Sequence, residues 1–280
     1  MKFRDLWSSR IKKTNTETAD LLIVSYPKSG RTWLRMLVGS YVCNAFGLSE
    51  DLLLETTRIT RQADLPVTEF THADSALRTL VSFKNYKIED NYFYDRPIVF
   101  LSREIKDTLV SAYYQATYRA GLFEGSLPEF IRSDLFGVRK IVEFYNVWLD
   151  HLSKIEHGLV ISYEGLHKDP EDIVGKVLRF MEVNPIDPTL VSRAVNYCAF
   201  ENMKRLERQG TFAGSILNPA DRHNEKSYKV RLGKVGGYNE ELSRECVQHI
   251  ENAIDEFGHS GLRDFVSSGR LATNNDEKKS

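Results

Sequence analysis

Three short apolar segments, each close to a stretch with helical periodicity, constrain the fold of this chain more than any other feature. They are LLIVSY, PIVFLSR and GLVISY, at residues 21–26, 97–103 and 158–163. Each is shorter than a typical buried helix, rich in β-branched residues and bounded by proline or glycine, which predicts a buried strand. Apolar residues recur at helical spacing in six further stretches: residues 31–46, 104–119, 138–155, 170–183, 188–208 and 239–257.

This alternation predicts an α/β fold, a P-loop-like three-layer arrangement in which helices flank a central parallel sheet on both faces. In such folds ligands bind beyond the carboxyl ends of the strands. Residues 26–30, Arg103 and Tyr163 all lie at the ends of predicted strands. We therefore expect the chemistry of the chain to be gathered on one rim of the sheet.

The composition is that of an ordinary globular chain: 41% of the 280 residues are hydrophobic and 28% are charged. Without repeats or a low-complexity linker, we expect a single domain over residues 1–280, with a leader at 1–18 and a disordered polar tail at 267–280. The formal net charge of −1 argues against a nucleic-acid partner held by bulk electrostatics, so any anion site must be a local cluster.

Cysteine usage and hydropathy predict a cytoplasmic protein. The three cysteines are scattered, which favours reduced thiols and argues against a zinc site: Cys43, Cys198 and Cys246. The first 20 residues lack the apolar core of a signal peptide, and no stretch approaches the about 20 apolar residues that span a bilayer. Apolar residues of the leader stand among basic ones and either pack on the domain, which we favour, or contact a membrane surface weakly: Phe3, Leu6, Trp7 and Ile11.

The segment YPKSGRTW, residues 26–33, joins the first predicted strand to the first predicted helix. Glycine permits a tight turn, and the free N–H groups of a helix start favour a phosphate. Lys28 adds a positive charge, and Ser29 and Thr32 add hydroxyl donors. The triphosphate loop is spelled G-x-x-x-x-G-K-[ST], whereas Lys28 precedes the only glycine here. With no acidic strand end to hold Mg²⁺, a metal-free anion donor fits better than ATP.

YPKSGRTW resembles the 5′-phosphosulfate loop of the cytosolic-type sulfotransferases, usually spelled YPKSGTTW. These enzymes transfer a sulfuryl group from 3′-phosphoadenosine 5′-phosphosulfate (PAPS) and release 3′-phosphoadenosine 5′-phosphate (PAP). The one departure, Arg31, loses a hydroxyl contact and adds a cation near the phosphate. The resemblance spans about residues 21–242, and it implies PAPS use without a metal. It further implies donor-binding roles for Lys28, Ser29, Gly30, Arg31, Thr32 and Trp33.

Two further segments resemble parts of this family that hold the 3′-phosphate and close over the donor. In FLSREIKDTLVSAYY, Arg103 follows a strand and Ser111 comes eight residues later, as in the family's 3′-phosphate element. VRLGKVGGYNEEL resembles the family's RKGxxGDW segment, with Arg231 and Gly233 in matching places. Leu232 replaces the lysine of that segment, so the resemblance implies no lysine contact to the phosphate at this position. The resemblance implies that Arg103, Ser111 and Arg231 hold the 3′-phosphate.

The resemblance also assigns an adenine-binding site and a catalytic general base. Trp33 and Phe200 match the two stacking partners of the adenine, and Tyr163 matches a tyrosine close to it. His72, in VTEFTHADS, resembles the catalytic histidine, whose ordinary pKa suits the deprotonation of a hydroxyl. Phe70 stands where the family often has lysine, which predicts either a different acceptor pocket or weaker help to the leaving group. The other histidines are expected at the surface: His151, His157, His167, His223, His249 and His259.

The acceptor is expected to be a small molecule, a sugar or a lipid headgroup with a hydroxyl, and its pocket is expected in residues 49–81, Phe83, Tyr86 and residues 113–118. The oligomeric state stays open. Two other functions also stay open. One is a P-loop-like kinase that uses ATP and Mg²⁺, and the other is a nucleotide-binding relative without activity. Lys28 and His72 together favour the active sulfotransferase.

Overall fold

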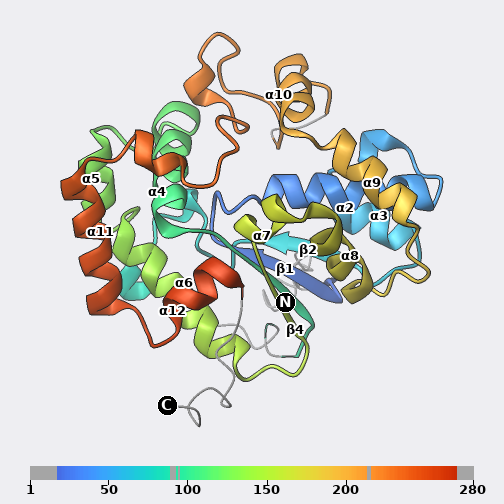
Figure 1. The fold of residues 1–280 in the computed structure, drawn as a ribbon, viewed down its shortest axis with the longest axis horizontal. Coiled ribbons are helices and arrows are strands. Elements are labelled where there is room, and N and C mark those ends of the chain that lie inside the picture. Colours follow the sequence, from blue (N-terminus) through green and yellow to red (C-terminus); the bar gives the residue numbers. More distant parts are fainter. Residues whose placement is uncertain (1–17, 89–92, 94, 213–215, 270–280) are drawn as a thin grey trace, which may run out of the picture.

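A four-stranded parallel sheet forms the centre of the molecule (Figure 1). The computed structural model describes residues 18–88, 93, 95–212 and 216–269. The strands are β1 (Leu21–Ser25), β2 (Thr68–Thr71), β3 (Ile98–Ser102) and β4 (Gly158–Ser162), in the order β2-β1-β3-β4. In register, Ile23 pairs with Phe70 on one side and Val99 on the other. The predicted α/β class with a central parallel sheet is confirmed.

Alternate residues of the central strands supply two separate cores. Leu22 and Val24 of β1 belong to one buried cluster, whereas Leu21 and Ile23 belong to the other. All five residues of β1 and of β3 are buried, because helices cover both faces of these strands. This explains the uninterrupted apolar runs that the sequence shows.

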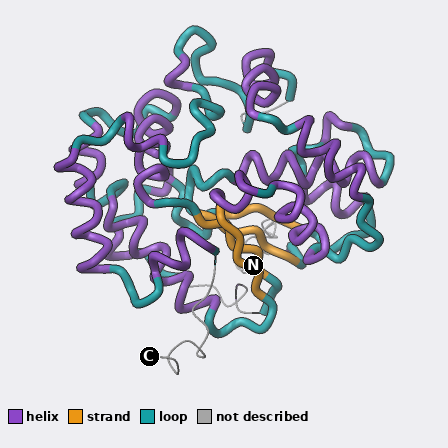
Figure 2. Tube along the Cα trace, in the orientation of Figure 1, coloured by secondary structure: helices purple, strands orange, loops and turns teal. Residues whose placement is uncertain are grey.

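Two groups of helices contribute to these cores (Figures 1 and 2). The first group packs on the Leu22 side: α4 (Ile105–Tyr114), α5 (Leu127–Arg132), α6 (Val138–Leu152), α11 (Arg244–Phe257) and α12 (Leu262–Ser268). The second packs on the Leu21 side: α2 (Arg31–Ala45), α3 (Thr56–Gln62), α7 (Tyr163–Lys168), α8 (Pro170–Phe180), α9 (Pro188–Tyr197) and α10 (Phe200–Gln209). Short helical turns lie in the connections between these elements: η1 (Glu50–Leu52), η2 (Leu77–Thr79), η3 (Phe83–Asn85), η5 (Gln115–Arg119), η6 (Glu225–Ser227) and η7 (Gly237–Glu240).

Three predicted helices differ by more than the position of their last few residues. The stretch 188–208 forms two helices, because extended backbone at Ala199 separates α9 from α10. In the stretch 239–257 the α-helix begins only at Arg244, after the short turn η7, and the hydroxyl of Ser243 accepts a hydrogen bond from the amide of Cys246 and caps α11. Residues 115–119 continue α4 as one wider π-helical turn.

The predictions for the chain ends fall mostly outside the described residues. The leader is described only from residue 18, and the tail only as far as residue 269, where α12 reaches Ser268. Within the described chain, no helix combines the length and apolar character needed to cross a bilayer. The three cysteines are buried and free, in agreement with the prediction of reduced thiols.

Candidate active site

The turn between β1 and α2 has the backbone shape of an anion-binding loop. Lys28 and Gly30 both have positive φ, 74° and 94°. A Cβ at residue 30 would lie 2.5 Å from Cδ2 of Tyr163, so only glycine lets α2 begin this close to the end of β4. The first turn of α2, at Arg31 and Thr32, leaves amide groups without helical acceptors. These amides are available to an anion.

A cavity of about 570 Å³ lies beside this turn. Seven cationic residues line it: Lys28, Arg31, Arg78, Arg103, Lys229, Arg231 and Lys234. Asp107 is the one carboxylate among the described lining residues, and the amides of Gly236 and Tyr238 already donate to its two oxygens, at 2.7 and 2.9 Å. The cavity therefore suits a ligand with several negative charges.

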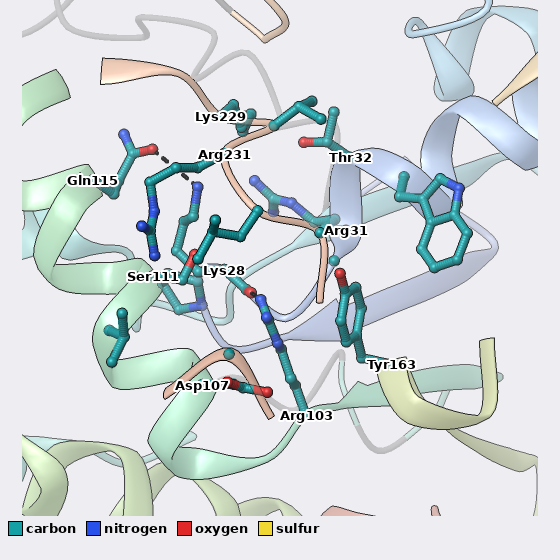
Figure 3. A pocket seen from close by; sticks show the side chains of 18 of the residues that line it. Lys28, Arg31, Thr32, Arg103, Asp107, Ser111, Gln115, Tyr163, Lys229 and Arg231 are labelled. Atoms are coloured by element: carbon teal, nitrogen blue, oxygen red, sulfur yellow. Dashed lines mark hydrogen bonds between the residues drawn. The ribbon is translucent and has the colours of Figure 1, made fainter. Parts of the chain in front are cut away.

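Burial and neighbouring cations both act on the side chain of Lys28. Its Nζ donates to Oε1 of Gln115 at 3.5 Å (Figure 3). Burial and then the charges of Arg119 and Arg103 lower its pKa to about 7. An anion beside Nζ would favour the charged form, because it would offset both effects.

Arg103 connects the two loops that border the cavity. Its Nη1 donates to the carbonyl oxygen of Lys28 at 2.8 Å, and its Nη2 donates to that of Lys234 at 3.4 Å. The guanidinium carbon lies 4.1 Å from the ring centroid of Tyr163. Its buried Nε has no hydrogen-bond partner among the described residues. A ligand phosphate would supply the acceptor that this donor lacks.

The second loop, residues 229–238, is called the late loop below. Arg231 on this loop donates to Oε1 of Glu241 at 2.7 Å, and its guanidinium carbon lies 3.8 Å from the ring centroid of Tyr114. Ser111 on α4 lines the same cavity. The structure thus brings Arg231 and Ser111 to one cavity with Arg103, as the resemblance implied.

Aromatic side chains line the end of the cavity beside α7 and α10. The rings of Trp33 and Tyr163 meet edge to face at 5.9 Å, and that of His167 lies 4.8 Å from Trp33. Phe200 lies under Gly233, where a Cβ would come within 2.2 Å of the Phe200 ring. Such rings offer faces for a flat base.

Lys229 lines the cavity but is not among the residues predicted from the sequence. Glu207 on α10 places it: this buried carboxylate accepts from the amides of Lys229 and Val230, at 2.7 and 2.8 Å, and from Nη1 of Arg119 at 3.0 Å. The one signal in the sequence was a further cation two residues before Arg231.

His72 lies at the carboxyl end of β2 and lines the cavity. Its Nδ1 lies 2.8 Å from the carbonyl oxygen of Ser25, which can only accept, so Nδ1 carries the proton and Nε2 keeps its lone pair. Burial lowers the pKa of His72 well below 6.5, and the charge of Arg31 lowers it further. The ring is therefore neutral at pH 7 and able to accept a proton.

All but one of the predicted donor-site residues line the cavity, and the exception is Ser29, whose side chain is fully buried. Phe70 does not line it either. Its ring is buried in the α2 core, with the guanidinium carbon of Arg35 4.7 Å from the ring centroid. Phe70 was predicted to influence an acceptor pocket, but its side chain does not contact the cavity directly.

The predicted acceptor region lies only partly at the cavity. Of its residues, Ala76, Leu77, Arg78 and Gln115 line the cavity, as does Leu122 from outside the predicted region. Tyr86 belongs to the core on the Leu22 side, where its hydroxyl donates to the carbonyl oxygen of Ala73 at 3.1 Å, and Tyr113 packs against that core. Phe83, Tyr114 and Tyr118 do not line the cavity either. The prediction of a surface position was wrong for His151, which is 3% exposed because it packs against Trp148.

Comparison with known proteins gives the family and the fold of the chain. The family described as "sulfotransferase domain" matches residues 18–261. Flavonol 3-sulfotransferase of Flaveria bidentis is 26% identical over 294 residues, which cover 93% of this chain and 92% of the relative. Cytosolic sulfotransferase 12 of Arabidopsis thaliana is 23% identical over 299 residues and covers 94% of this chain and 87% of its own.

Among solved structures, mouse sulfotransferase SULT7A1 complexed with PAP has a TM-score of 0.59 at 18% identity. The match covers 88% of this chain and 87% of the mouse chain. At this identity the likeness shows the fold, which is the P-loop-like α/β fold of the sulfotransferases.

Proposed function

The chain belongs to the sulfotransferase domain family, and we propose that it moves a sulfuryl group from PAPS to an acceptor hydroxyl, with His72 as the general base. The observation that carries the proposal is the hydrogen bond from Nδ1 of His72 to the carbonyl of Ser25. It leaves Nε2 as an acceptor in the cavity that also holds Lys28.

The donor site is proposed from the fit between the cavity and PAPS. A molecule with a flat base and two separate anionic groups matches a cavity that is lined by aromatic rings and by cations from two loops. We assign the 5′-phosphosulfate to the turn at Lys28 and Gly30, and the 3′-phosphate to Arg103, Ser111 and Arg231. The unsatisfied Nε of Arg103 supports this assignment.

The proposed reaction is an in-line displacement at sulfur. Nε2 of His72 takes the proton of the acceptor hydroxyl while that oxygen forms a bond to sulfur. The bond between sulfur and the bridging oxygen breaks, and its electron pair stays on the phosphate of PAP. Lys28 lies in the turn where this charge develops, so its ammonium would stabilise the leaving oxygen.

The acceptor is proposed to be a small molecule. The relative from Flaveria bidentis, named for its action on a flavonol, supports this class. A cytoplasmic location is part of the proposal, because relatives carry the name cytosolic sulfotransferase.

Replacement of His72 by alanine tests the assignment of the base. General-base catalysis typically contributes about 10²–10⁴-fold, so turnover with labelled PAPS should fall by that factor while PAP binding in a calorimeter persists. His157→Ala, at an exposed histidine, serves as the control and should keep full turnover. Near-complete activity of His72→Ala would remove His72 from the mechanism.

A second assay separates sulfuryl transfer from the alternatives. The chain is incubated with an acceptor panel and either labelled PAPS in EDTA or ATP with Mg²⁺. Labelled acceptor in the first mixture supports the proposal. Transfer only from ATP would support a kinase, and PAP binding without transfer to any acceptor would support a relative without activity.

A further inference from the structure

Two cations of the cavity lie at the His72 end rather than in the proposed 3′-phosphate site. Nη1 of Arg31 lies 3.5 Å from the carbonyl oxygen of Phe70, two residues before His72. Nζ of Lys229 donates to the carbonyl oxygen of Ile216 at 2.9 Å. Both side chains line the cavity, one from the start of α2 and the other from the late loop (Figure 3). The charges of both also lower the pKa of His72, in addition to burial, which has the largest effect.

Neither cation is paired with a carboxylate within the described part of the chain. The acidic group that acts on Arg31 is Glu69, which lies 3.9 Å from Arg35 and hydrogen-bonds to Thr57. Glu207 binds the backbone amide of Lys229 and leaves its ammonium without an acidic partner. Burial and the neighbouring charges of Lys28 and Arg119 hold the pKa of Lys229 well below its ordinary value. A bound anion would relieve this repulsion.

The cavity that holds these cations also has apolar lining residues. Ala76, Leu77 and Leu122 line the cavity together with His72. An acceptor body can therefore pack against apolar side chains while a charged substituent reaches the cations. Pockets of this kind combine apolar contact area with a few polar groups that fix the orientation of the ligand.

We propose that Arg31 and Lys229 form a subsite for a carboxylate or sulfate group carried by the acceptor, beside the hydroxyl that His72 deprotonates. This inference rests on the proposed function and narrows it, because it makes the preferred acceptor an anionic alcohol or phenol. Since the donor already brings negative charge to the same cavity, a neutral site would repel such an acceptor. The positive charges of Arg31 and Lys229 offset this repulsion.

Matched acceptors test the subsite. We would measure kcat/KM with labelled PAPS for 4-hydroxyphenylacetate and its neutral amide, and for glucuronate and glucose. The anionic member of a pair should be preferred at least about tenfold, since hydrogen bonds to charged groups are strong. The ratio within a pair cancels any effect of a variant on the donor or on His72.

The ratio is then compared among three variants. Lys229→Met should bring it close to one, and Lys229→Arg should keep most of it because the charge remains. Lys226→Met is the matched control, since Lys226 is exposed on the same segment and does not line the cavity. It should leave the ratio unchanged.

The outcomes separate this inference from the function on which it rests. A preference for the neutral members, a ratio unaffected by Lys229→Met, or failure to turn over any anionic member would overturn the subsite. Calorimetric binding of PAP, measured with the same protein, reports on the donor site alone. Loss of both PAP binding and all sulfation would instead overturn the proposed function.

Discussion

The two loops that border the cavity are held in place by different means. The first, residues 26–33, depends mainly on its own backbone: positive φ at Lys28 and Gly30, and a glycine that admits the ring of Tyr163. The late loop depends on carboxylates from other elements, Asp107 on α4 and Glu207 on α10. The backbone shape of the first loop therefore depends largely on its own residues, with a tertiary hydrogen bond from Arg103 to the carbonyl oxygen of Lys28, whereas the late loop is anchored by carboxylates of other elements.

This difference predicts different costs of mutation. Damage to the first loop should act mainly on donor binding, because its strain lies where the ligand is expected. Damage to the anchors of the late loop should act on folding as well, because a buried carboxylate that satisfies several donors leaves all of them unsatisfied when it is removed. Three measurements test the comparison.

The largest effect is expected for Glu207→Ala. The variant leaves two backbone amides without their acceptor and Arg119 without its buried partner at 3.0 Å. Breaking a buried ion pair from one side costs about 3–5 kcal/mol, and we expect a decrease of that size in the free energy of unfolding. Urea denaturation followed by tryptophan fluorescence measures it.

Glu225→Ala is the control for this experiment. Glu225 is exposed and reaches Lys204 and Arg208 at 3.5 and 3.7 Å. Exposed pairs contribute about 0–1 kcal/mol, so its unfolding midpoint should shift little. Equal losses in the two variants would contradict the special role of Glu207 in the late loop.

The next largest effect is expected for Gly30→Ala, which tests the first loop. An alanine at residue 30 would have to adopt φ near 94°, and its Cβ would lie 2.5 Å from the Tyr163 ring. We expect the free loop of the variant to relax away from this shape, so that PAP binding has to restore it. Strain of about 1–2 kcal/mol plus a similar cost of overlap then predicts a loss of PAP affinity of about 100-fold, measured by calorimetry.

Gly236→Ala in the late loop provides the matched comparison. Residue 236 also has positive φ, 75°, but its Cβ would meet only Nδ2 of Asn239, at 3.6 Å. Strain without overlap should weaken PAP binding by about tenfold at most. If Gly30→Ala and Gly236→Ala weakened PAP binding equally, the contact with Tyr163 would have no part in shaping the first loop.

The comparison also explains how much of the structure was predictable. Strands β1, β3 and β4 follow from short apolar runs, and the first loop was predictable because its residues 26–33 form one contiguous motif. His72 needed the resemblance, since nothing in the four-residue strand before it marks a base. The short strand β2 itself has only a weak pattern.

The remaining features depend on contacts between distant residues. Lys229 reaches the cavity because Glu207, 22 residues earlier, holds its amide. Phe70 was expected to affect the acceptor pocket, but the alternation of β2 turns its ring toward the α2 core. The break between α9 and α10 brings the carbonyl oxygen of Cys198 to within 3.1 Å of Nε1 of Trp33, a contact that no local pattern indicates.

The smallest effect is a pH dependence of donor binding that originates in the first loop. Burial and neighbouring cations lower the pKa of Lys28 to about 7 in the free protein, and a bound phosphate would raise it. The contribution of the charged lysine is therefore present below pH 7 and is lost as the pH rises above it. Between pH 7 and 8, where a phosphate is already mostly dianionic, the Kd of PAP should increase by about fivefold.

Lys28→Arg identifies the group responsible, because a guanidinium remains charged throughout this range. Its Kd for PAP should be nearly constant from pH 7 to 9, whereas that of the wild type rises. Lys229 is the other lysine of the cavity with a strongly lowered pKa, so an equally steep profile in Lys28→Arg would assign the titration to the late loop. Such a result would reverse the comparison, because the late loop would then control the charge of the donor site.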